Sequence, residues 1–81
     1  MTLEVKFFAR ARDIVGSGAA PLDLPAGATV GDLRAALAER YPDLRPLVPR
    51  LHIAVGQDYA TDTTLLSPAS DVACFPPVSG G

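Results

Sequence analysis

Hydrophobic and polar side chains alternate at the start of the chain. Leu3, Val5 and Phe7 lie on one face of the segment from Leu3 to Ala9. A period of two predicts a β-strand with one buried face, so we assign these three residues to the core. Phe8 falls on the opposite face, among charged residues. The pattern therefore predicts an aromatic side chain on the outer side of the strand.

The next segment predicts a hairpin partner for this strand. Residues 9–15 can form a short helical turn, which Gly16 and the flexible pair 17–18 end. Leu22 and Leu24 then alternate around Asp23 and indicate a second short strand. The intervening loop is too long for a two-residue turn, so we expect a loose hairpin.

A helix follows in the middle of the chain. Thr29 and Asp32 have the spacing of a capping box, with Asp in place of Glu. Hydrophobic residues then recur at helical spacing: Val30, Leu33, Ala36, Leu37 and Tyr41. This stripe predicts an amphipathic helix of about three turns. Pro42 ends it, because a residue before proline avoids the α region.

The second half of the chain predicts three further strands, over residues 51–55, 59–61 and 72–75. Residues 43–50 contain two prolines and predict a crossover loop with room for one helical turn. We expect Leu65 and Leu66 to fill the core from a loop. Pro76 and Pro77 end the last strand because proline cannot donate to a sheet.

The order of elements predicts an α+β fold. One main helix covers one face of a mixed sheet of four to five strands. The first strand must pair with the last if both are to be buried, which is the β-grasp arrangement. We expect one domain over residues 1–75 and an extended C-terminal tail over residues 76–81, with no repeat or second domain.

Composition narrows the classes of function. The chain has 81 residues, 48% of them hydrophobic, and a formal net charge of −2. This charge argues against nucleic acid and against an anionic membrane surface as partners. The single cysteine, Cys74, rules out an internal disulfide and a CxxC zinc site, so we expect no metal. Without a signal-peptide pattern or an apolar run of about 20 residues, a cytoplasmic location is expected.

The tail carries the candidate chemistry. It reads Pro76, Pro77, Val78, Ser79, Gly80, Gly81. Two glycines without side chains can enter a narrow channel, and the last atoms form a carboxylate. ATP can convert such a carboxylate to an acyl-adenylate, and a sulfur donor can then leave a thiocarboxylate. A Gly-Gly ending alone is also compatible with a frayed terminus.

Three segments are similar to the small subunits of molybdopterin synthase. The opening Phe-Phe-Ala-Arg-Ala-Arg-Asp-Ile-Val-Gly (7–16) resembles their first strand and turn, and Ala-Val-Gly-Gln (54–57) resembles a later turn. The ending Asp-Val-Ala-Cys-Phe-Pro-Pro-Val-Ser-Gly-Gly (71–81) is similar to theirs. The resemblance spans the whole chain, and the ending is its most specific part.

The resemblance implies a ubiquitin-like β-grasp sulfur carrier. A ubiquitin-activating-type adenylyltransferase would consume ATP to adenylate Gly81, and a sulfur donor would convert it to 1-thioglycine. The tail would then enter a large synthase subunit, in an assembly of two small and two large subunits. Sulfur would pass there to cyclic pyranopterin monophosphate during molybdenum cofactor biosynthesis. The family implies no bound cofactor.

Three aromatic residues are candidates for partner binding. Phe8 and Phe75 lie on the outer face by alternation, and Tyr59 can join them from the fourth strand. Grouped exposed aromatics are typical of an interface. Single exposed apolar residues are also common, and this reading stays open for Phe8 and Tyr59. For Phe75, at the base of the tail, we favour docking.

The other polar candidates have plain structural interpretations. Cys74 is expected to pack as a small buried hydrophobe rather than to handle sulfur. His52 is expected on a strand surface, and the aspartates at 58, 62 and 71 as solvated turn residues. Arg10 and Arg12 can steer toward an acidic partner or form a solvated edge. With no nucleophile–base pair or phosphate loop in the sequence, we do not expect an enzyme on its own.

Three alternatives remain at this stage. A carrier for thiazole synthesis would share the chemistry, although such carriers are usually shorter and lack this ending. A ubiquitin-like modifier would join Gly81 to lysines of other proteins, with Lys6 as the single lysine for self-linkage. A plain binding module would not need the tail.

Overall fold

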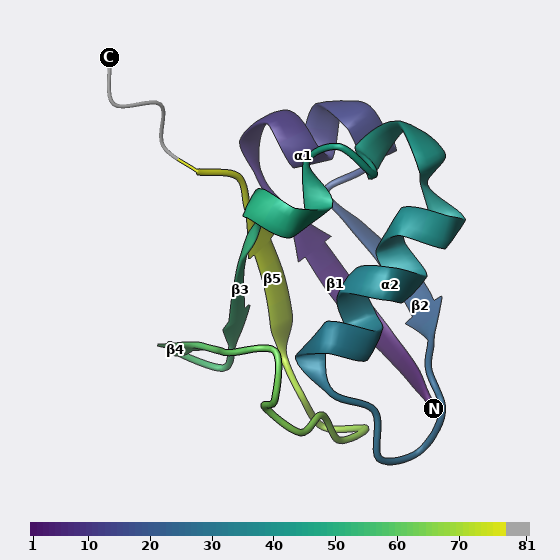
Figure 1. Cartoon of the computed structure of the whole chain (residues 1–81), viewed down its shortest axis with the longest axis vertical. Helices are drawn as coiled ribbons and strands as arrows, with labels where there is room; N and C mark the ends of the chain where they lie inside the picture. Colours follow the sequence, from purple (N-terminus) through teal and green to yellow (C-terminus); the bar gives the residue numbers. More distant parts are fainter. Residues whose placement is uncertain (78–81) are drawn as a thin grey trace.

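A computed structural model describes residues 1–77 of the chain. Its five strands are β1 (Thr2–Phe7), β2 (Ala19–Asp23), β3 (His52–Val55), β4 (Asp58–Tyr59) and β5 (Val72–Phe75). Its helices are α1 (Ala9–Val15) and α2 (Val30–Arg40), with two 3₁₀ turns, η1 (Pro42–Leu44) and η2 (Val48–Arg50). Figure 1 shows α2 lying across one face of the sheet.

The strands form one mixed sheet in the order β2-β1-β5-β3-β4. β5 lies in the middle, parallel to β1 and antiparallel to β3. The register pairs Phe7 with Cys74 on one side of β5 and His52 with Phe75 on the other. The predicted pairing of the first strand with the last is therefore confirmed, as is the α+β class with one main helix.

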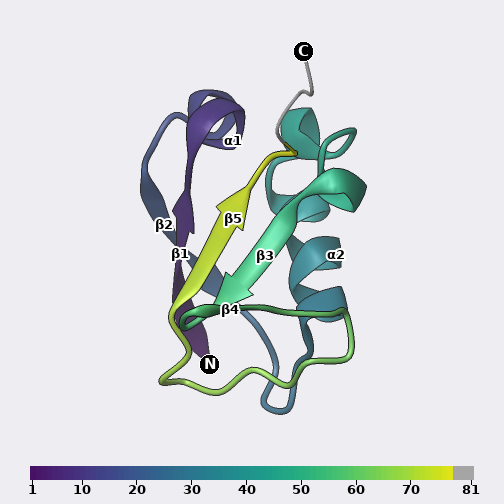
Figure 2. The same cartoon turned by 90° about the vertical axis from the view of Figure 1, so that its left-hand side faces the viewer.

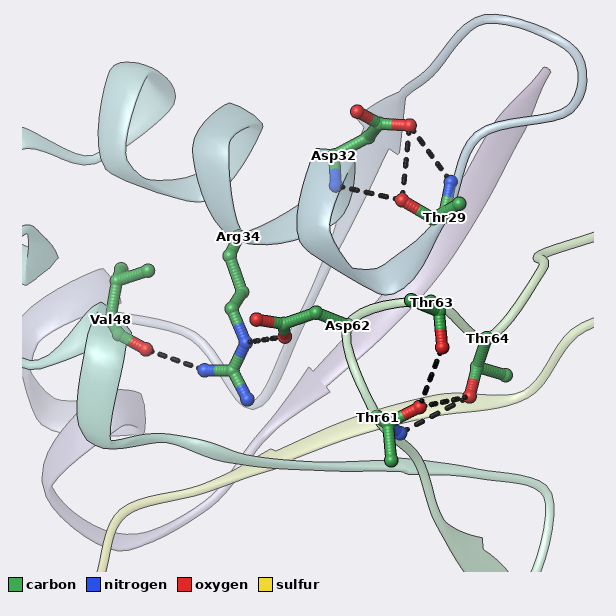
Figure 3. A network of polar contacts seen from close by, with 8 residues as sticks. All are labelled: Thr29, Asp32, Arg34, Val48, Thr61, Asp62, Thr63 and Thr64. Atoms are coloured by element: carbon green, nitrogen blue, oxygen red, sulfur yellow. Dashed lines mark hydrogen bonds and ion pairs between the residues drawn. The ribbon is translucent and has the colours of Figure 1, made fainter.

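The capping box predicted for α2 is confirmed. The Asp32 amide donates to Thr29 Oγ1 at 3.3 Å, and the Thr29 amide donates to Asp32 Oδ2 at 2.9 Å (Figure 3). A docked loop adds two more acceptors, because Val30 N donates to Thr64 O and Gly31 N to Asp62 O. The first turn of α2 is thus closed by the protein's own acceptors, which leaves no ready anion site there.

Hydrophobic side chains from both layers build one core. The sheet contributes the predicted Leu3, Val5 and Phe7, and α2 contributes Val30, Leu33 and Leu37. Cys74 is fully buried among them, as expected. Arg34 of α2 ties the surrounding loops together, since its Nε lies 2.7 Å from Asp62 Oδ1 and its Nη1 donates to Val48 O at 2.6 Å (Figure 3).

Several details differ from the sequence-based expectation. The second strand begins at Ala19 rather than near Leu22, and it tolerates Pro21 because β2 is an edge strand. Leu66 is buried, but Leu65 is 70% exposed, so its assignment to the core was wrong. The loop over 43–50 contains two 3₁₀ turns, and the fourth strand covers residues 58–59 rather than 59–61.

Candidate docking surface at the base of the tail

β1 and β5 end side by side, and their ends hold two aromatic rings against each other. The Phe8 amide donates to the Cys74 carbonyl at 3.2 Å. The Phe8 and Phe75 rings stack with centroids 4.7 Å apart and an interplanar angle of 5°. The parallel pairing of β1 with β5 therefore brings together two residues that are far apart in the sequence.

A turn with unusual backbone geometry follows Phe8. Ala9 has φ of 52°, in the left-handed region that residues with a Cβ rarely adopt. This turn lets the chain leave β1 and enter α1 directly. It also fixes where the Phe8 ring lies relative to β5.

The antiparallel partner strands extend the surface on the other side of Phe75. His52 is the register partner of Phe75, and its ring meets Tyr59 edge-on at 5.9 Å. A shallow hollow of about 440 Å³ lies between these rings and the start of the tail. It is lined by Phe8, Ala9, His52, Tyr59, Phe75, Pro76 and Pro77, which we call the tail-base surface.

The three aromatic residues predicted to bind a partner all line this surface. Phe8 is 42% exposed and Tyr59 75% exposed, while Phe75 is half-buried beneath its neighbours. Phe8 and Phe75 touch directly, whereas Tyr59 contacts His52 instead. Sequence reasoning placed His52 on the strand surface but missed its part in this cluster. The outward side of the β3 alternation was the available signal.

The tail begins at the rim of this surface. Pro76 is half-buried and Pro77 exposed, and both line the hollow. Val78, Ser79, Gly80 and Gly81, the remaining predicted tail residues, lie outside the residues that the structure describes. Their predicted chemistry, including that of the Gly81 carboxylate, stays a prediction.

Cys74 has the properties of a core residue rather than a sulfur-handling thiol. Its side chain is fully buried, and burial raises the pKa of the Cys74 thiol to about 12, against a smaller lowering by Arg34. A thiol with so high a pKa is not a nucleophile near neutral pH. The buried position explains why the thiol of a cysteine next to the tail is not a reactive group of the site.

The acidic residues within residues 1–77 lie apart from one another or in ion pairs with basic residues. No group of three or more His, Cys, Asp or Glu side chains in this range could hold a metal ion. Two of the aspartates predicted as solvated turn residues form ion pairs, Asp62 with Arg34 at 2.7 Å and Asp71 with Lys6 at 3.4 Å. Over the same residues, neither helix has the length and apolar character needed to cross a membrane.

Comparison with known sequences gives a consistent family. The chain matches the ThiS family over residues 5–81. The molybdopterin synthase sulfur carrier subunit of Arabidopsis thaliana is 30% identical over 79 residues, covering 98% of this chain and 82% of that protein. The Caenorhabditis briggsae protein of the same name is 32% identical over 83 residues, covering 100% and 99%. These names agree with the expectation of a carrier rather than an enzyme by itself.

Solved structures share the fold. Small archaeal modifier protein 1 of Haloferax volcanii has a TM-score of 0.84 at 27% identity, covering 95% of this chain and 98% of that one. A chain in the complex of subunits 1 and 2 of molybdopterin-converting factor from Helicobacter pylori 26695 has a TM-score of 0.70 at 23% identity, with both chains fully covered. The ubiquitin-like β-grasp fold predicted from the sequence is confirmed by these neighbours.

Proposed function

The chain belongs to the ThiS family, and from that membership we propose that it is the sulfur carrier subunit of a molybdopterin synthase. The relatives that cover nearly the whole chain carry this name. The proposal is a carrier function, in which the reactive atoms belong to the C-terminal carboxylate and the folded domain presents them.

One observation carries the proposal: the central strand of the sheet leads straight into the tail. β5 is held on both sides by β1 and β3, so Phe75 is a fixed point. The six residues after it can span at most about 20 Å. A rigid base with a slender extension suits delivery of the Gly81 carboxylate into another protein's active site.

The chemistry proceeds in three steps, each performed by a partner. An adenylyltransferase joins the Gly81 carboxylate to AMP from ATP and releases pyrophosphate. A sulfur donor then displaces AMP and leaves a thiocarboxylate, 1-thioglycine. The large subunit transfers this sulfur to cyclic pyranopterin monophosphate, and water restores the Gly81 carboxylate. No side chain of the carrier needs to act as acid, base or nucleophile.

The tail-base surface supplies the contact that holds the carrier in place during these steps. Its stacked aromatic rings surround the point where the tail begins, so a partner that receives the tail must also approach them. Aromatic residues contribute strongly to interfaces because they bury a large apolar area. We propose that Phe8, Tyr59 and Phe75 bind the large subunit, in an assembly of two small and two large subunits.

Intact-mass measurement tests the carrier chemistry. The purified chain is incubated with ATP, a sulfide source and the host's adenylyltransferase. A mass gain equal to the exchange of one oxygen for sulfur is expected, and deletion of Gly81 should abolish it. An unchanged mass with a competent adenylyltransferase would contradict the proposal. In the host, gene deletion should abolish molybdoenzyme activity, whereas loss of thiamine would indicate a carrier for thiazole synthesis.

A second candidate function is protein modification. The similarity to small archaeal modifier protein 1 favours it, because that protein is named a modifier. The same activated Gly81 would form an amide with a lysine instead of accepting sulfur. Lysine-linked adducts ending in Gly80-Gly81, detected on host proteins by mass spectrometry, would support this function.

A further inference from the structure

Charged residues are segregated between the two ends of the domain. Figures 1 and 2 place α1, η1, η2 and the end of α2 at the end of the molecule where β5 finishes. The N-terminus and the loop before β5 lie at the opposite end. We assign the charged residues of α1, η1, η2 and the end of α2 to the tail-bearing end, and all other charged residues to the far end.

The two ends carry opposite net charge. The tail-bearing end has five arginines and three carboxylates, which leaves +2: Arg10, Arg12, Arg40, Arg45 and Arg50 against Asp13, Glu39 and Asp43. The remaining chain has two basic and six acidic side chains, which leaves −4: Lys6 and Arg34 against Glu4, Asp23, Asp32, Asp58, Asp62 and Asp71. The side-chain charge is therefore divided unevenly between the ends, and the difference keeps its sign when the Met1 ammonium and the terminal carboxylate are counted, at +1 and −3.

The basic residues of the two ends also differ in whether they form ion pairs. Both basic residues outside the tail-bearing end are already paired, Lys6 with Asp71 and Arg34 with Asp62. Within residues 1–77, the five arginines of the tail-bearing end are all exposed and none is in an ion pair. We call two of them, Arg10 and Arg50, the arginine rim.

The arginine rim flanks residues of the tail-base surface in the chain, whereas Arg40 lines a hollow beside Pro21 and Asp23 and Arg45 one beside Arg34 and Asp62. Arg10 directly follows Ala9, which lines the hollow of the tail-base surface. Arg50 ends η2 two residues before His52, the register partner of Phe75. Arginines thus lie on both sides of the aromatic cluster, where a partner that receives the tail must make contact.

We propose that the arginine rim binds an acidic protein surface around the entrance through which the large subunit receives the tail. The inference rests on the proposed carrier function and adds that the partner surface around the entrance for the tail is acidic. Because the tail spans at most about 20 Å, arginines at its base meet the partner's outer surface rather than the reacting atoms. Their role is to orient and accelerate the encounter, with the acidic far end turned away.

A polyanion such as nucleic acid is a poorer fit for the same arginines. The tail-bearing end also holds three carboxylates, and the side chains of the far end sum to −4. A nucleic acid or an anionic membrane extends over more than one end of so small a domain and would meet this negative charge. An acidic protein surface confined to the tail-bearing end would not meet the negative charge of the far end.

A matched pair of double variants tests the proposal. Arg10→Gln with Arg50→Gln removes two positive charges beside the tail-base surface. Ala26→Glu with Ala69→Glu makes the same change in net charge at exposed sites of the far end. The association rate constant with the host's large subunit is measured by stopped flow at about 10 mM and about 1 M salt, where the Debye lengths are about 30 Å and 3 Å.

The rim variant is expected to associate about three- to tenfold more slowly at low salt and to match the wild type at high salt. The far-end variant should keep the wild-type rate. Equal slowing of both variants, or a wild-type rate that does not change with salt, would overturn the arginine rim as a docking site. Faster association of the rim variant would do the same, since it indicates a basic partner surface. A wild-type chain that does not bind the large subunit at all would instead refute the proposed carrier function.

Discussion

Replacing Phe8 by alanine should weaken both partner binding and the fold, by amounts that can be measured separately. The Phe8 ring is 42% exposed, and its best contact is the stack on Phe75 at 4.7 Å. Full burial of a phenylalanine contributes about 1.5–3 kcal/mol, and Phe8 is little more than half buried. With about 0.5–1.5 kcal/mol from the stack, the loss in unfolding free energy should be about 1.5–3 kcal/mol. That loss lowers the melting temperature by about 4–8 °C for each kcal/mol.

Binding should lose free energy as well, because the partner would bury the exposed part of the ring. Truncation of an aromatic anchor at the centre of an interface costs about 2 kcal/mol or more, or about 30-fold in Kd. Phe75→Ala should have a similar effect, and the double variant should lose less than the sum because the two rings share one contact. Calorimetric titration with the large subunit and thermal unfolding of the free chain give the two numbers separately.

Leu65→Ala is the matched control. Leu65 is a large apolar residue with 70% exposure, but it lies in the loop at the far end. Its truncation should change neither Kd nor melting temperature appreciably. If Phe8→Ala and Phe75→Ala both leave Kd within about twofold of wild type while the melting temperature falls, the stack supports the fold only, and the docking role is wrong.

Three further predictions concern the fold that carries this surface. Ala9→Gly should raise the free energy of unfolding by about 0.5–1 kcal/mol in urea titrations, because glycine adopts the φ of 52° without strain. Arg34→Ala should lower it by about 1–2 kcal/mol, since the variant loses the bonds to Asp62 and to the Val48 carbonyl. Cys74 should make stability fall between pH 9 and pH 12: below its ordinary pKa of 9.0 the thiol is neutral in both states, and above it only the unfolded chain ionises until the folded pKa of about 12 is reached.

Each of these has its own check. Ala9→Val should destabilise, and a loss of stability in Ala9→Gly would show that the left-handed turn is not strained. Arg45→Ala changes an exposed arginine without an ion pair within residues 1–77, so an effect as large as that of Arg34→Ala would contradict the role of the Arg34 contacts. Cys74→Ala should reduce the fall of the unfolding free energy with pH above pH 9. If the slope is the same as in the wild type, other groups cause the fall.

The order of elements followed from local patterns in the sequence. The α2 stripe, the Thr29–Asp32 capping box and the alternation in β1 each depend on residues a few positions apart. Such patterns identify the element and its buried face directly. Leu65 and Leu66 were harder, because adjacent apolar residues in a loop have no period, and only packing decides that Leu66 enters the core.

The tail-base surface could be predicted only in part, because its residues come together through register. Alternation puts Phe8 and Phe75 on outer faces, but contact between their rings requires the parallel pairing in which Phe7 lies opposite Cys74. A slip of one residue in β5 would turn Phe75 into the core and expose Cys74. The buried thiol therefore does contribute to the site, since a small apolar group at position 74 fixes the face on which Phe75 begins the tail. The same register fits the proposed carrier function, because β5, the strand that leads into the tail, is held by β1 on one edge and β3 on the other.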